Sequence, residues 1–152
     1  HSIPDKTYFN HLFRVSQNQI IFGANYFIEY LKNTQCFIFW DKTIHGNSYA
    51  DGELLWTSFK SPARYYRKNI AQIEKEGERQ HPTQKSIHIY KWLLKNYAKE
   101  GDKIIDTHGG SMSIALACHD MKYDLDLWEL DSDYFAAGKK RYDNHIKQLQ
   151  LW

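Results

Sequence analysis

The sequence predicts an α/β fold that is doubly wound, with a mainly parallel sheet and helices on both faces. Short apolar runs of strand length alternate with segments of helical periodicity, which is the pattern of βαβ units. The length of 152 residues suits one compact domain, and a hydrophobic content of 42% is enough for a core. We therefore expect a single domain over residues 1–152.

The first half of the chain contains three expected strands. A helix is expected over 4–15 because Phe9, Leu12 and Phe13 share one face. The apolar runs that follow are too short for buried helices, so they are expected as strands. The expected strands are 19–22, 36–40 and 53–59, with a short helix at 25–31, a loop at 43–52 and a mixed, highly charged segment at 62–80.

The periodicity sharpens after Pro82. Ile87, Tyr90, Leu94 and Tyr97 recur at helical spacing, which predicts a helix. A β-strand, a loop and a helix then follow in an order that predicts a βαβ unit. The expected elements are strands at 103–106 and 123–129, a glycine-containing loop at 107–111, and helices at 112–121 and 132–149.

Composition excludes several classes of protein. Cys36 and Cys118 lie far apart in apolar surroundings, so both are expected as reduced core thiols. No C-x-x-C or H-E-x-x-H motif occurs, so no zinc site is expected. No apolar run approaches the roughly 18 residues of a membrane helix, and no signal peptide is visible. We expect a soluble, cytoplasmic protein without a membrane partner; the formal charge of +2 neither demands nor excludes nucleic acid.

A ligand site is expected where the 103–106 strand ends in a glycine-containing loop. Doubly wound folds bind nucleotide-like ligands at this position, where glycines allow close approach and a helix begins. Glu129 ends the following strand, and a carboxylate there can accept hydrogen bonds from ribose hydroxyls. An ordinary βαβ turn is the alternative. A nicotinamide cofactor is another, although the fingerprint G-x-G-x-x-G is absent.

The segment His81-Pro82-Thr83-Gln84-Lys85 makes the assignment specific. It precedes a helix with Tyr-Lys-Trp-Leu-Leu, then Gly-Asp-Lys-Ile-Ile-Asp and a Gly–Ser loop. This order resembles the C-terminal half of the beta-class DNA methyltransferases, which methylate the exocyclic amine of adenine (N6) or cytosine (N4). Segments 3–6, 14–23 and 25–27 also resemble one branch of that family. The resemblance implies a Rossmann-like methyltransferase fold and S-adenosylmethionine as the cofactor.

The resemblance also implies a cofactor-binding core over 81–131. Two positions depart from the family pattern: Met112 stands where glycine is usual, and Ser86 where a second proline is usual. Met112 either crowds the cofactor or packs at the start of the helix. The implied cofactor-binding residues are Pro82, Thr83, Gln84 and Lys85 along the methionine, Asp106, Gly109, Gly110, Ser111 and Ser113 in the loop, and Glu129 at the ribose with Asp131 as a neighbour.

The catalytic motif of that family is absent from this chain. Its members use (Asp/Asn/Ser)-Pro-Pro-(Tyr/Phe/Trp), whereas the prolines here are Pro4, Pro62 and Pro82, with no adjacent pair. In the family order the motif precedes the region with which this chain opens, and it caps a central strand. We therefore expect the catalytic residues in a segment upstream of His1 and a sheet that lacks a central strand. A naturally decayed or split enzyme is the alternative.

The expected DNA-recognition segment is 43–80, which precedes the HPTQK motif and includes the third expected strand, because target recognition lies in this interval in the family that the chain resembles. Basic side chains are interleaved with aromatic ones there and suit phosphates and bases, although a solvated loop is the alternative. The interval is short, so a homodimer or a partner subunit is expected to complete the recognition of double-stranded DNA. Tyr26 and Trp40 either flank the base pocket or are core aromatics. The residues assigned to DNA are Arg64, Tyr65, Tyr66, Arg67 and Lys68.

These observations lead to one principal hypothesis and two alternatives. The first is a DNA methyltransferase that transfers a methyl group from S-adenosylmethionine to adenine N6 in preference to cytosine N4, for example in restriction–modification. The second is a non-catalytic subunit that binds cofactor or DNA, which the absent Pro-Pro motif favours. The third is a nicotinamide-dependent oxidoreductase.

Overall fold

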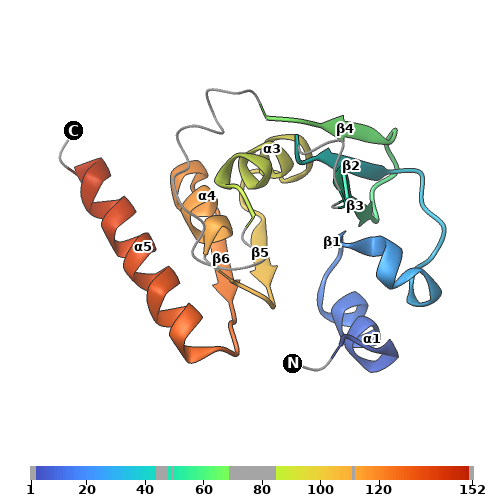
Figure 1. Cartoon of the computed structure of the whole chain (residues 1–152), viewed down its shortest axis with the longest axis horizontal. Helices are drawn as coiled ribbons and strands as arrows, with labels where there is room; N and C mark the ends of the chain where they lie inside the picture. The colour runs from blue at the N-terminus through green and yellow to red at the C-terminus, as the bar shows by residue number, and fades with distance from the viewer. Residues whose placement is uncertain (1–2, 44–47, 49, 69–84, 111, 151–152) are drawn as a thin grey trace. The chain divides into compact units, whose positions relative to one another are not determined.

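The computed structural model describes residues 3–43, 48, 50–68, 85–110 and 112–150. The chain divides into two compact units, 1–67 and 68–152, which are described separately below (Figure 1). The first unit contains α1 (Lys6–Val15), β1 (Ile20–Phe22), the 3-10 turns η1 (Ala24–Tyr26) and η2 (Ile28–Tyr30), β2 (Phe37–Asp41), β3 (Gly52–Thr57) and β4 (Arg64–Tyr66). The second contains α3 (Ile87–Tyr97), β5 (Lys103–Asp106), α4 (Ser113–Met121), β6 (Asp124–Leu127) and α5 (Ser132–Gln150).

The sheet of the first unit has the order β1-β3-β2-β4. β3 is antiparallel to both β1 and β2, whereas β2 and β4 are parallel. The antiparallel pairing departs from the mainly parallel sheet expected from the order of elements. Its cause is the short connection between Asp41 and Gly52, since a parallel neighbour needs a crossover of about a dozen residues or more. β4 was not expected as a strand, because its charged and aromatic residues do not alternate with apolar ones.

The core of the first unit forms between α1 and the sheet. Phe9 is 2% exposed and packs with Ile21, Ala24 and Trp56. Asp5 starts the helix by accepting a hydrogen bond from the Tyr8 N–H at 3.0 Å, which is the role of an N-cap. The helix that carries Phe9 is therefore determined by a local signal, and its position is determined by apolar burial.

The second unit contains the βαβ arrangement that the sequence predicts. β5 and β6 are parallel and are joined through α4, with Lys103 opposite Asp124 and Asp106 opposite Leu127. Helix α4 packs against α3 and β6 (Figure 1), and Cys118 is buried in the core of this unit. Both cysteines are free and buried, as expected. The predicted α/β class is confirmed.

One face of the β5–β6 pair is exposed. Ile105 is 40% exposed, and Lys103 and Asp126 form an ion pair of 3.0 Å with about half of each side chain accessible. The alternation of exposed and half-buried residues in both strands shows that the described helices cover only the other face. Helices on both faces were expected, so the described part of this unit shows one of the two expected layers.

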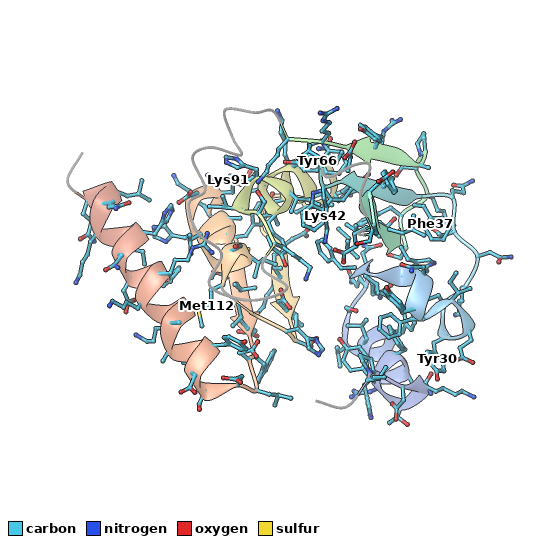
Figure 2. The ribbon with its side chains drawn as sticks, viewed as in Figure 1. Tyr30, Phe37, Lys42, Tyr66, Lys91 and Met112 are labelled. Carbon is cyan, nitrogen blue, oxygen red and sulfur yellow. The ribbon has the colours of Figure 1, made fainter. Side chains whose placement is uncertain are left out.

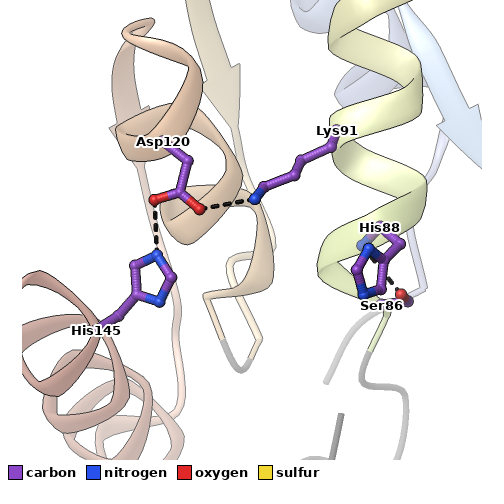
Figure 3. Close-up of polar contacts among 5 residues, drawn as sticks. All are labelled: Ser86, His88, Lys91, Asp120 and His145. Atoms are coloured by element: carbon purple, nitrogen blue, oxygen red, sulfur yellow. Dashed lines mark hydrogen bonds and ion pairs between the residues drawn. The ribbon is translucent and has the colours of Figure 1, made fainter. Parts of the chain in front are cut away.

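A charged cluster joins three helices of the second unit (Figure 3). Asp120 on α4 contacts Lys91 on α3 with an Nζ–Oδ2 distance of 2.8 Å, and His145 on α5 with an Nε2–Oδ1 distance of 2.7 Å. Burial raises the pKa of Asp120, but hydrogen bonds from Lys91 and His145 outweigh it, so the pKa lies below its ordinary value of 3.8. The cluster therefore stabilises the packing of α3, α4 and α5 while Asp120 is ionised.

Replacement of Asp120 by asparagine is expected to lower the free energy of unfolding by about 1–3 kcal/mol at pH 7. The lowered pKa sets the pH dependence: the stabilisation is present above pH 3.8 and is lost as the pH falls through the lower folded-state pKa. Urea denaturation at pH 7 and at pH 3 measures the difference. The control is Asp126→Asn, since its exposed ion pair with Lys103 contributes little. Equal losses for the two variants at pH 7 would contradict the prediction.

The described residues also show what the fold lacks. Within these ranges, no helix combines the length and apolar character that crossing a membrane requires. The same residues contain no group of three or more His, Cys, Asp or Glu side chains arranged to bind a metal ion.

Candidate functional site

The candidate site lies at the carboxyl ends of β5 and β6. Asp106 is the last residue of β5, and Glu129 follows β6 by two positions. Residues 107–110 leave β5 toward the start of α4. Parallel α/β sheets bind ligands at this edge, because the loops there leave backbone groups free at the start of a helix.

Backbone hydrogen bonds hold the loop against the end of β6. The Trp128 N–H donates to the Asp106 carbonyl at 3.0 Å, and the Gly109 N–H donates to the Trp128 carbonyl at 2.7 Å. Gly109 packs so closely that an added Cβ would lie 2.4 Å from Cδ2 of Leu127. Any larger residue at this position would require the Leu127 side chain to move. Gly109 therefore allows the loop to pack closely against β6.

Replacement of Gly109 by alanine is expected to lower the free energy of unfolding by about 1–3 kcal/mol, because its Cβ overlaps the side chain of Leu127. The three atoms closest to that Cβ all belong to the Leu127 side chain, so Leu127→Ala makes room for it. The loss of stability in the double variant is therefore expected to be smaller than the sum of the losses in the two single variants. Urea denaturation of all four proteins measures this coupling, and strict additivity would refute the steric explanation.

Glu129 connects the end of β6 to the loop. Its Oε2 accepts a hydrogen bond from the Gly110 N–H at 2.8 Å, and its Oε1 accepts one from the Asp131 N–H at 3.3 Å. Each carboxylate oxygen has two lone pairs, so each can accept one more hydrogen bond. Asp131, in contrast, uses its Oδ1 to accept from the Asp133 and Tyr134 N–H groups at the start of α5. Asp131 therefore caps α5 and supports the position of Glu129.

Asp106 lies in an environment of mixed charge. Desolvation raises the pKa of its carboxyl, whereas the hydrogen bond from the His108 N–H, at 2.8 Å, and the charge of Lys85 lower it; the charge of Glu129 raises it further. The electrostatic contribution of Lys85 shows that the last residue of the HPTQK motif lies near the end of β5. We call Lys85, Asp106, His108, Gly110 and Glu129 the strand-end cluster.

Ser113 and Met112 occupy the beginning of α4. The Ser113 side chain is buried, and its Oγ accepts a hydrogen bond from Nη1 of Arg141 on α5 at 2.7 Å. Met112, labelled in Figure 2, precedes α4. Its φ of 66° is a left-handed conformation that favours glycine, and the residue is 5% exposed. Met112 therefore packs at the start of the helix, which is the second of the two expected roles.

Four of the expected cofactor-binding residues lie outside the part of the chain that the structure describes. Pro82, Thr83, Gln84 and Ser111 lie outside the described residues, so their predicted roles stay predictions.

The five residues assigned to DNA differ in how exposed they are. Arg64, Tyr65 and Arg67 are exposed, whereas Tyr66 is 7% exposed and thus packs as a buried aromatic. Lys68 is half-buried and belongs to the second unit. Of the two other aromatics considered, Trp40 is buried and Tyr26 is largely exposed.

The sequence analysis did not predict the contacts of Tyr65 with two residues of β2. Phe39 stacks against Tyr65, and the Tyr65 hydroxyl donates a hydrogen bond to Asp41. The sequence analysis also did not predict that Arg141 donates a hydrogen bond to Ser113. An exposed Phe39 between buried Ile38 and Trp40 follows the two-residue period of a strand, which is the signal that could have found it.

Comparison with known proteins agrees with this geometry. A family model of DNA methylases, N6_N4_Mtase, matches residues 13–140, which is most of the chain. The chain belongs to the N6/N4 DNA methylase family. The resemblance seen in the HPTQK segment and the glycine loop is thereby confirmed. No match to this methylase is found among curated proteins.

Solved structures share the fold of the methylase. The crystal structure of an M1.HpyAVI-SAM complex is 21% identical, covers 91% of this chain and 83% of its own, and has a TM-score of 0.60. A second crystal structure of M1.HpyAVI is 22% identical, covers 83% of this chain and 72% of its own, and has a TM-score of 0.54. The Rossmann-like methyltransferase fold is therefore confirmed.

Proposed function

We propose that this methylase binds S-adenosylmethionine at the strand-end cluster and methylates double-stranded DNA in the cytoplasm, at adenine N6 in preference to cytosine N4. The observation that carries the proposal is the Glu129 carboxylate, which follows β6 and accepts a hydrogen bond from the loop that follows the parallel strand β5. Membership of the N6/N4 family supports DNA as the substrate, and the structural neighbour M1.HpyAVI was crystallised with SAM.

The residues present fit this cofactor chemically. S-adenosylmethionine carries an ammonium group, a sulfonium, a carboxylate and a ribose diol, and it supplies the electrophilic methyl group. Glu129 and Asp106 are acceptors for the hydroxyl and ammonium hydrogens, and Lys85 is a cation for the carboxylate. Gly110 is left-handed, with φ 56°, and donates its N–H to Glu129 without adding a side chain at its own position.

Each residue then has a proposed role. Glu129 accepts hydrogen bonds from the ribose while it holds the loop. Asp106, whose pKa is raised by desolvation, would be stabilised as a carboxylate by a bound cation. Lys85 neutralises part of the excess acidic charge of the cluster. Pro82, Thr83, Gln84 and Ser111 are proposed to complete the site on the basis of the family resemblance alone.

The proposal assigns residues to cofactor binding and not to the transfer step. The sequence contains no Pro-Pro pair, so no residue of this chain matches the family's catalytic motif. For the same reason, a second candidate function is a subunit that binds cofactor or DNA while another chain performs the transfer.

We propose residues 1–152 as one methyltransferase domain, with 43–80 as its DNA-recognition segment. A homodimer or a partner subunit completes the recognition of DNA in this proposal.

Two measurements on the whole chain test the proposal. Calorimetry with S-adenosylmethionine measures binding, and transfer of a labelled methyl group to duplex DNA measures activity. Binding together with transfer supports the methyltransferase. Binding without transfer supports the non-catalytic subunit, and the absence of binding contradicts both. Digestion of the methylated DNA to nucleosides separates N6-methyladenine from N4-methylcytosine.

A further inference from the structure

Two exposed aromatic rings lie side by side on the sheet of the first unit. Phe39 on β2 and Tyr65 on β4 are register partners, and their rings stack with centroids 6.2 Å apart and an interplanar angle of 21°. Phe39 is 39% exposed and Tyr65 is 58% exposed. Because β4 is an edge strand, the pair lies beside the rim of the sheet. We call Phe39 and Tyr65 the aromatic platform.

Buried polar groups hold the platform in place. The Tyr65 hydroxyl donates a hydrogen bond to Oδ2 of Asp41, a residue that is 4% exposed. The other oxygen of Asp41 accepts a hydrogen bond from the Thr43 N–H at 2.7 Å. The tyrosine ring is therefore anchored at its hydroxyl end, while more than half of the residue stays exposed. A surface held in its binding geometry loses little conformational entropy when a ligand binds.

Positive charge accompanies the aromatic surface. Arg67 lies two positions after Tyr65 and is exposed, whereas Arg64 is exposed on the opposite face of β4 by the two-residue period of a strand. The hydrogen bond to Asp41 raises the pKa of Tyr65, and the guanidinium of Arg67 acts in the opposite direction, which places that guanidinium near the hydroxyl. Asp41 is 4% exposed, so its carboxylate adds little accessible negative charge beside the guanidinium of Arg67. Stacked rings with adjacent guanidinium groups are the elements of single-strand nucleic-acid recognition.

We propose that the aromatic platform stacks on an unpaired base of DNA, while Arg67 contacts a neighbouring phosphate. The face of a base becomes accessible to a side chain only where the base has left the helical stack, so the ligand is a single-stranded or extruded nucleotide. The DNA ligand rests on the proposed function, but the stacking surface rests on the geometry of Phe39, Tyr65 and Asp41. Phe39 and Asp41 thereby acquire roles as a stacking residue and a positioning residue.

The test measures the affinity of the whole chain for three fluorescent probes by anisotropy. The probes are a single-stranded oligonucleotide, the duplex of the same sequence, and a strand of equal length and charge made of abasic sites. Phe39→Leu is expected to weaken binding of the single strand by roughly tenfold and to leave binding of the abasic strand unchanged. Arg67→Ala is expected to weaken binding of both strands and to reduce the salt dependence. Ile28→Ala, which removes another exposed apolar side chain from the same unit, is the matched control.

Tyr65→Phe provides a second variant that keeps the ring and removes its hydrogen bond to Asp41. It is expected to weaken binding of the single strand less than Tyr65→Leu does, with urea denaturation confirming that each variant is folded. Equal affinity of Phe39→Leu and the natural chain for the single strand would overturn the proposal. An equal loss on the abasic strand would also overturn it.

Calorimetry with S-adenosylmethionine on the same proteins separates this proposal from the proposed function. A chain that binds S-adenosylmethionine but shows no platform effect refutes the platform alone. A chain that binds neither cofactor nor any DNA probe refutes both.

Discussion

Replacement of Glu129 by alanine is expected to weaken the binding of S-adenosylmethionine by roughly 10- to 100-fold, which corresponds to a lost hydrogen bond to a charged group. The substitution removes the acceptor proposed for the ribose hydroxyls. It also removes the partner of the Gly110 and Asp131 N–H groups, so the loop loses its side-chain contact with the end of β6 and keeps the backbone hydrogen bond from Gly109 to Trp128. Calorimetry measures the affinity, and circular dichroism checks that the domain stays folded.

Two further variants separate the causes. Glu129→Gln keeps an amide oxygen for the Gly110 N–H but removes the charge, so it is expected to bind the cofactor more tightly than the alanine variant and more weakly than the natural chain. Asp133→Asn changes an exposed acidic residue in the first turn of α5 and is expected to have no effect. Unchanged affinity of Glu129→Ala would remove the ribose assignment.

Replacement of Phe9 by alanine is expected to lower the free energy of unfolding of the first unit by about 3–5 kcal/mol. Phe9 is 2% exposed, and its ring lies 5.2 Å from that of Phe27 and 5.6 Å from that of Tyr30. The cavity left by the ring would remove the main contact between α1 and the turns after β1. Because a small domain is stable by only about 5–15 kcal/mol, this loss is large enough to unfold much of the unit on warming.

Urea denaturation followed by circular dichroism measures this effect. Val15→Ala on the same helix is the control, because Val15 is 51% exposed and surface substitutions usually change stability by less than about 0.5 kcal/mol. If Phe9→Ala lost no more stability than Val15→Ala, the core described between α1 and the sheet would be wrong.

The sequence predicted most elements to within a few residues. β5 was expected over 103–106 and is found there, and α5 was expected over 132–149 and ends one residue later. These elements were predictable because their signals are local: an apolar run bounded by turns, and a helical period of apolar residues. β4 could not be predicted, since its three residues become a strand only by pairing with β2.

The candidate site was predictable to a similar extent. Asp106, Glu129 and Lys85 were named from the order of motifs, and the structure brings the three into one electrostatic environment. Their hydrogen bonds could not be predicted, and neither could the different role of Asp131, whose carboxylate caps α5. Hydrogen bonding depends on the direction of side chains at a loop, which a sequence pattern does not specify.

The sequence by itself thus determined the α/β class, the family resemblance and the position of the glycine loop at the end of β5. Only the tertiary structure decided that Phe39 lies against Tyr65 and that Asp120 joins Lys91 to His145. The physical reason is the separation along the chain over which each kind of interaction acts. Periodicity and turn signals act between neighbours in the chain, whereas these contacts join residues from different elements, and they exist only once strand register and helix packing are set.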